Sequence, residues 1–323
     1  MLFQLLLYLA VLVPLTLSAP IFGILDRADS PTTPVTVEDL ETSFLRAAQF
    51  TRVAYCSSRV VSKWECGGPC EEVGKGVKVI QAGGDDGLIP GYFVAHDPTT
   101  ASIVVAHQGT DSRKILSILN DAQLLLRDIN TKRFTSAKGK SIEVHDGFQK
   151  TFERTADEVV AAVQRGLTEF KVKKVHVMGH SLGGAIATLD ALLLRQELDN
   201  SIEVATTVFG VPRVGNEEFA DFVDETLAPT FTRITNQKDP IPRVPPRLFG
   251  YQHPSGEVHI NAVNKEGQAT DIVGCEGQEN ESDGCSSGNE VFRKILRLDT
   301  AGAKDHTGPY FGNISFSSSA CPL

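Results

Sequence analysis

One short segment constrains the fold of this chain more than any other. Residues 179–183 (GHSLG) match the pattern G-x-S-x-G, follow a β-branched run at residues 175–178, and precede an Ala- and Leu-rich stretch at residues 182–197. A strand, a sharp turn and a helix in this order form a nucleophile elbow, in which glycines on either side of the serine leave room for the turn. The segment predicts that Ser181 is a nucleophile held above a sheet edge. The alternative is a Gly-rich turn with an inert serine.

The rest of the chain alternates between short apolar runs and helical periodicity. Strand-like runs lie at residues 102–106, 175–178, 204–209 and 231–234, helical patterns lie at residues 151–167 and 182–197, and Asn216 is expected to cap a further helix. Strands that are apolar throughout and alternate with helices are typical of a mostly parallel central sheet covered on both faces. The predicted fold class is therefore α/β.

A serine nucleophile needs an acid further along the chain. Serine is a weak nucleophile at neutral pH and requires a base that a carboxylate orients, and after a nucleophile elbow this acid precedes the histidine. Asp239 fits the acid, because it lies in a proline-containing loop after the run at residues 231–234. Asp190, Asp221 and Asp224 fall in helical patterns and are expected on solvated faces.

The base must then be one of three histidines that follow Asp239. Position near the C-terminal end favours His306 over His253 and His259 only modestly, since position alone does not choose a base. His253 and His259 are interpreted as surface or hydrogen-bonded structural histidines.

The oxyanion of a tetrahedral intermediate needs two hydrogen-bond donors. The backbone N–H of Leu182, the residue after the nucleophile, is one of them. Thr110 is the predicted second donor, because it follows the run at residues 102–106 at the expected place in chain order. The alternative is that residues 109–110 merely end a strand.

The N-terminal segment predicts export. Residues 1–19 carry no charged side chain and end in small residues before Pro20, as a signal peptide does, with a membrane anchor as the alternative. Residues 20–36 are expected to form a linker or pro-segment, and residues 37–323 the folded domain. Outside the first segment no run reaches the ~18 apolar residues of a membrane span, so a secreted, extracellular protein without integral membrane association is predicted.

The charge balance excludes one class of partner. Of the 323 residues, 31 are Lys or Arg and 40 are Asp or Glu, which gives a formal net charge of −9. Such a chain lacks the basic field that holds phosphate groups, so binding to nucleic acid or to an anionic membrane surface is disfavoured.

Six cysteines follow the predicted cleavage site, and in an oxidising compartment they can pair in 15 ways. Cys66 and Cys70 are close enough in sequence to close a local loop, and so are Cys275 and Cys285. These two pairs leave Cys56 and Cys321, which would form a long-range bridge. Neither a CxxC pair nor a neighbouring histidine at ligand spacing supports a zinc site. Asn280 and Asn313 begin glycosylation sequons.

Several further motifs occur in a fixed order along the chain. They are residues 109–110 (GT), 145–148 (HDGF), 179–184 (GHSLGG), 212–216 (PRVGN), 239–246 (DPIPRVPP) and His306 with residues 310–312 (YFG). In these motifs the chain resembles the class 3, fungal-type secreted lipases of the α/β-hydrolase superfamily, from about residue 37 to the C-terminus. The resemblance implies an α/β-hydrolase fold with a short helical lid.

The resemblance also implies a role for each site residue. It makes Ser181 the nucleophile, Asp239 the orienting acid, His306 the base, Thr110 and Leu182 the oxyanion donors, and Cys56 and Cys321 a bridge. Two positions depart from the family pattern: Gln108 stands where members commonly carry Arg, and the lid lacks a tryptophan, since the only one is Trp64.

The lid is expected directly after Thr110. If residues 111–120 form a helix, one face carries the apolar side chains of Ile115, Leu116, Ile118 and Leu119. Such a face would close over the site in water and turn outward at a lipid droplet. The alternative is an ordinary amphipathic helix packed permanently on the core.

These features together predict a secreted serine ester hydrolase. The specific expectation is a monomeric triacylglycerol lipase that acts on acylglycerols at an oil–water interface through an acyl-enzyme, with no metal or organic cofactor. One alternative is an esterase for feruloyl or other small esters, a specificity that the same family contains. The other is a catalytically silent homologue that binds lipid.

Overall fold

The computed structural model describes residues 31–84, 87–110, 125–288 and 302–322. The predicted signal peptide and the four predicted lid residues, Ile115, Leu116, Ile118 and Leu119, lie outside these ranges.

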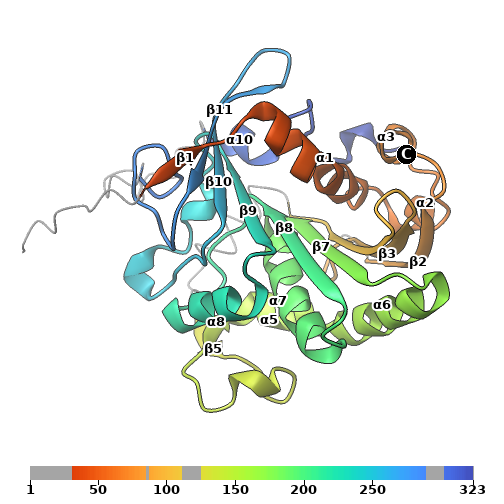
Figure 1. Ribbon diagram of the computed structural model, residues 1–323, viewed down its shortest axis with the longest axis horizontal. Helices are drawn as coiled ribbons and strands as arrows, with labels where there is room; N and C mark the ends of the chain where they lie inside the picture. Colours follow the sequence, from red (N-terminus) through yellow and green to blue (C-terminus); the bar gives the residue numbers. More distant parts are fainter. Residues whose placement is uncertain (1–30, 85–86, 111–124, 289–301, 323) are drawn as a thin grey trace, which may run out of the picture.

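A nine-stranded sheet forms the centre of the described part of the chain (Figure 1). Its strand order is β1-β11-β10-β9-β8-β7-β4-β3-β2. In chain order the strands are β1 (Thr32–Pro34), β2 (Lys78–Gly83), β3 (Tyr92–Asp97), β4 (Ser102–His107), β7 (Lys174–His180), β8 (Glu203–Phe209), β9 (Phe231–Asn236), β10 (Glu257–Val263) and β11 (Ala269–Cys275).

The sheet is mixed rather than mostly parallel. Its five central strands, β4, β7, β8, β9 and β10, run parallel, and all of them except β10 coincide with the predicted apolar runs. On one side β3 and β2 pair antiparallel, and on the other side β11 and β1 do so. The turn at residues 98–101 joins β3 to β4, and so short a connection permits only an antiparallel pair.

Helices cover both faces of this sheet (Figure 1). One face carries α1, and the other carries α5 to α8, each with its own cluster of buried apolar side chains. The helices are α1 (Val37–Val53), α2 (Ser58–Val61), α3 (Gly68–Val73), α5 (Asp146–Glu153), α6 (Ala156–Phe170), α7 (Leu182–Glu197), α8 (Glu217–Leu227) and α10 (Ala303–Thr307). A second, two-stranded sheet pairs β5 (Leu126–Asp128) with β6 (Glu143–His145).

The helix predictions hold in two places and fail in one. Asn216 caps α8, since its side chain accepts a hydrogen bond from the N–H of Phe219. The bounds of α7 are those predicted. The helix predicted at residues 151–167 is instead divided between α5 and α6, because α5 packs on α7 whereas α6 packs on β2, β3 and β4.

All three disulfides have the predicted pairing: Cys56–Cys321, Cys66–Cys70 and Cys275–Cys285. The sheet begins before residue 37, because Thr32 to Pro34 pair with Val273 to Cys275 of β11. The end of the segment predicted as a linker or pro-segment is therefore an edge strand of the sheet. Removal of residues upstream of it stays a prediction.

Candidate active site

Ser181 lies at the sharp turn between β7 and α7. Its φ of 58° is in the left-handed region, its side chain is buried, and its N–H donates to the carbonyl of Phe209 on β8. Gly179 and Gly183 make this turn possible, since a Cβ on Gly179 would lie 2.2 Å from the carbonyl oxygen of Gly183. A strained non-glycine residue of this kind is typical of functional sites. The predicted elbow is confirmed as a backbone geometry.

Asp239 and His306 form a buried pair beside this turn. His306 Nδ1 lies 2.9 Å from Asp239 Oδ2, and the other carboxylate oxygen accepts a hydrogen bond of 2.8 Å from the N–H of Ile241. His306 comes from α10 and Asp239 from the loop after β9. The contact with Asp239 fixes the orientation of the imidazole through Nδ1, so the second ring nitrogen, Nε2, takes no part in it.

Ser181 Oγ and His306 Nε2 are both buried and have no hydrogen-bond partner within the described residues. The ring of His180, which precedes Ser181, lies 4.4 Å from the ring of His306 between centroids. A buried polar atom without a partner is costly, and active sites are where such atoms persist. These are the two atoms between which a serine nucleophile passes its proton to its base.

Asn236 holds the chain around the histidine and was missed by the sequence analysis. Its side-chain Nδ2 donates to the carbonyl of Asp305 at 2.8 Å and to that of Pro309 at 3.1 Å. Asn236 is the last residue of β9, so it ties the acid loop to the histidine segment. An amide side chain at the end of an apolar strand is the only sequence signal for this role.

Tyr55 is a second residue that the sequence analysis missed. Its hydroxyl lies 2.5 Å from His180 Nδ1 and accepts a hydrogen bond of 3.2 Å from the N–H of Gly109. His180 Nε2 in turn lies 2.8 Å from the carbonyl of His306. Burial holds the pKa of His180 well below its ordinary value and raises that of Tyr55, so both side chains are neutral. This network joins the elbow, the predicted donor loop and the histidine segment.

The predicted oxyanion loop lies against the elbow. A Cβ on Gly109 would lie 2.6 Å from the carbonyl oxygen of His180 and 2.8 Å from Ser181 Cβ, so the backbone there is in direct contact with the nucleophile. Thr110 follows, half-buried, and Leu182 is the first residue of α7. Gln108, at the position where arginine is common, bonds Gly91 through both its backbone N–H and its side-chain oxygen. An amide therefore anchors this loop to the residue that precedes β3.

The other histidines and acids are placed differently from Asp239 and His306. His253 and His259 are buried, and they bond Pro242 O and Thr235 Oγ1 respectively, which confirms the structural interpretation. The prediction that Asp190 is solvated is wrong, because residues 182–194 of α7 are buried on every side. Asp221 is exposed, as expected.

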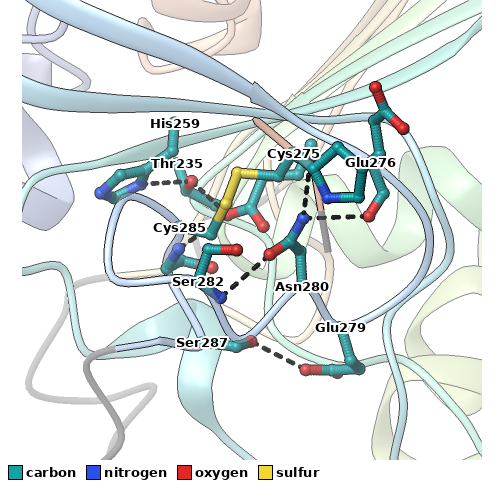
Figure 2. Close-up of a disulfide and its surroundings, with 12 residues drawn as sticks. Thr235, His259, Cys275, Glu276, Glu279, Asn280, Ser282, Cys285 and Ser287 are labelled. Carbon is teal, nitrogen blue, oxygen red and sulfur yellow. Dashed lines mark hydrogen bonds between the residues drawn. A yellow bond between two sulfur atoms is a disulfide. The ribbon is translucent and has the colours of Figure 1, made fainter. Parts of the chain in front are cut away.

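The Cys275–Cys285 disulfide closes a loop that begins at the last residue of β11 (Figure 2). Within it, Glu279 forms a buried ion pair of 2.6 Å with Arg213 and accepts from Ser287 Oγ at 2.8 Å. Arg213 also donates to the carbonyls of Arg243 and Pro245, which follow Asp239 in the chain. The residues of this loop therefore support the segment that carries the acid.

The two sequons differ in their fit. Asn280, in the same disulfide loop, is fully buried, and its Nδ2 donates to the carbonyls of Pro31 and Glu276 (Figure 2). A glycan on that nitrogen does not suit this position in the folded protein. Asn313 is exposed, so glycosylation there stays a prediction.

Comparison with known proteins gives a consistent match. Residues 104–249 match the model of the lipase (class 3) family. A secreted mono- and diacylglycerol lipase of Malassezia globosa is 31% identical over 296 residues, which cover 91% of this chain and 90% of that protein. The chain belongs to the class 3 lipase family. Another Malassezia globosa lipase of the same description is 35% identical over 65% of this chain and 69% of its own length.

Solved structures of fungal lipases have the same fold as this class 3 lipase. Lipase II from Rhizopus niveus superposes with a TM-score of 0.73 at 27% identity, over 90% of this chain and 100% of that one. The lipase from Rhizopus microsporus var. chinensis gives 0.72 at 28% identity, over 91% and 95%. The fold is therefore an α/β-hydrolase fold with a mixed central sheet.

Proposed function

We propose that this protein is a secreted serine hydrolase that cleaves the ester bonds of acylglycerols. The observation that carries the proposal is the buried arrangement at the carboxyl end of the sheet: Ser181 on its strained turn and the His306–Asp239 pair with Nε2 unpaired within the described residues. Membership of the class 3 lipases supports the reaction class.

In the proposed reaction the proton of Ser181 Oγ passes to His306 Nε2 as Oγ attacks the ester carbonyl. The carbonyl oxygen becomes an oxyanion, to which the backbone N–H groups of Leu182 and Thr110 donate. Asp239 stabilises the imidazolium that forms. The C–O bond to glycerol then breaks, and His306 returns the proton to the leaving alcohol. Water, deprotonated by His306, attacks the acyl-enzyme and releases the fatty acid and Ser181.

The substrate class follows from the relatives, whose names specify mono- and diacylglycerols, and from a triacylglycerol lipase among the similar structures. The predicted lid at Ile115, Leu116, Ile118 and Leu119 is proposed to control access at the lipid–water interface. Among the described helices none has the length and apolar character needed to cross a bilayer. Secretion as a monomer is part of the proposal.

The experiment is a substrate panel measured on the wild type and on Ser181→Ala. Monoolein, diolein and triolein emulsions are compared with methyl ferulate and a soluble short-chain ester. The proposal expects acylglycerol hydrolysis that rises when an interface forms, and no turnover by Ser181→Ala. A preference for methyl ferulate would instead support the small-ester esterase, and a wild type inactive on every ester would support the silent lipid-binding homologue.

A further inference from the structure

Asp190 and His107 form a buried contact outside the catalytic residues. His107 Nε2 lies 2.7 Å from Asp190 Oδ2, and both side chains are inaccessible to solvent. Burial raises the pKa of Asp190, while the contact with His107 lowers it. A carboxylate in the interior of an apolar helix is destabilising unless a partner compensates it, so a role beyond helix packing is expected for it.

The pair joins the two elements that carry the proposed oxyanion donors. His107 is the last residue of β4, and Thr110 follows it by three residues. Asp190 lies on α7, whose first residue is Leu182. Because the two donors belong to different elements, their separation depends on how α7 is held against the end of β4.

The backbone at this junction is closely packed. A Cβ on Gly183 would lie 2.5 Å from the carbonyl oxygens of both His107 and Gln108. Any shift of His107 along α7 therefore moves backbone that touches the start of that helix, and with it the N–H of Leu182.

A second contact is made by a face of the imidazole ring, whereas Asp190 contacts its Nε2 atom. The Tyr92 ring stacks on His107 with centroids 6.0 Å apart and planes at 21°, and the Tyr92 hydroxyl donates to Glu158 of α6 at 2.5 Å. Asp190 of α7, His107 of β4, Tyr92 of β3 and Glu158 of α6 thus form a chain of successive contacts. In this chain His107 lies between Asp190 and Tyr92.

We propose that Asp190 and His107 are positioning residues that set the geometry of the oxyanion hole by fixing α7 against the end of β4. This inference rests on the proposed ester hydrolysis. Neither side chain touches the substrate. Their loss is expected to slow the chemical step without weakening substrate binding.

The test is a variant series assayed on a soluble short-chain ester. Asp190→Asn keeps the size of the side chain and an oxygen atom beside His107 Nε2, and is expected to retain kcat within about threefold. Asp190→Leu removes the contact, and kcat is expected to fall by about ten- to a hundredfold with KM within twofold, since a misplacement of about 1 Å can cost about 10²-fold. The double variant His107→Phe/Asp190→Leu removes both buried polar groups, so it should melt near the wild type and still be slow.

Asp97 provides a matched control, because it lies at the end of the β3–β4 ladder opposite to the end that holds Tyr92 and His107. Asp97 is as buried as Asp190 and forms an ion pair of 2.5 Å with Arg46. On the ladder it lies opposite Ser102. Asp97→Asn is expected to lower the melting temperature and leave kcat unchanged.

Three results would overturn the inference. They are wild-type kcat in Asp190→Leu, wild-type kcat in the double variant, and a loss of kcat in Asp97→Asn as large as the loss in Asp190→Leu. A wild type that turns over no ester and reacts with no serine-directed phosphonate would overturn the proposed function itself, and this inference with it.

Discussion

Ser181 adopts a conformation that few side chains tolerate, and the residues around it explain how it is maintained. Its φ of 58° is held by a hydrogen bond to β8 below and by the Gly109 backbone against its Cβ. Strain of this kind persists only where the surroundings over-determine it. At the residue scale, the site is therefore a set of fixed backbone contacts as much as a set of three side chains.

Tyr55 is the residue whose contribution is most directly measurable at this scale. Tyr55→Phe keeps the ring but leaves the Gly109 N–H and His180 Nδ1 without their partner. We expect kcat on a soluble ester to fall about tenfold because Gly109 precedes Thr110, and the free energy of unfolding to fall by about 1–3 kcal/mol.

The matched control for Tyr55→Phe is Thr51→Val. It removes a buried hydroxyl of α1, which donates to the Ala47 carbonyl at 2.8 Å, and is expected to leave kcat unchanged. Wild-type kcat in Tyr55→Phe would contradict the role given to this network.

At the scale of elements, the Cys56–Cys321 bridge follows Tyr55 directly and closes the chain over a separation of 265 residues. Replacing both cysteines by serine should lower the free energy of unfolding by about 5 kcal/mol, since the loss grows with loop length. The same replacement at Cys66 and Cys70, separated by 4 residues, should cost about 2 kcal/mol. Urea unfolding of both variants checks this order, and the reverse order would contradict it.

The elements that the sequence predicts well are those set by local pattern. The bounds of α7, the Asn216 cap and four of the five central strands, all but β10, follow from apolar runs and from capping chemistry. The antiparallel edges and the break between α5 and α6 depend on which partner each element packs against, which no local pattern records. Asp190 shows the same limit, because its compensating partner His107 lies 83 residues earlier.

The site divides in the same way. Chain order and loop composition predict Asp239, but position favours His306 only modestly over His253 and His259. Geometry distinguishes them, since the 2.9 Å contact with Asp239 belongs to His306. Tyr55 and Asn236 could not be predicted, because their role consists of bonds to side-chain and backbone atoms that are distant in sequence.

At the scale of the whole molecule, buried neutral histidines should make stability depend on pH. Burial lowers the pKa of His145 and His176 to about 4 and that of His253 to about 3. In the unfolded chain these groups take up protons near pH 6.5, so between about 6.5 and 4 the unfolded state binds more protons. Stability from these groups is fully present above pH 6.5 and is lost as the pH falls.

Urea unfolding at pH 7 and pH 5 measures this effect. The free energy of unfolding should be lower at pH 5, by up to about 1.4 kcal/mol per pH unit for each histidine. His176→Gln should reduce the slope of the free energy of unfolding against pH by up to the amount that one proton contributes, about 1.4 kcal/mol per pH unit. An equal or higher free energy of unfolding at pH 5 in the wild type would show that these histidines are not held neutral.

The central claim is that Ser181 is the nucleophile, activated by His306 and Asp239. Titration with a serine-directed phosphonate, followed by peptide mass spectrometry, tests it most directly. We expect one adduct per chain on Ser181, with ester hydrolysis lost in proportion to labelling, and in Ser181→Ala neither an adduct nor turnover above about 10⁻⁵ to 10⁻⁶ of the wild type. Turnover preserved in a correctly folded Ser181→Ala, or inactivation through an adduct elsewhere, would contradict the account.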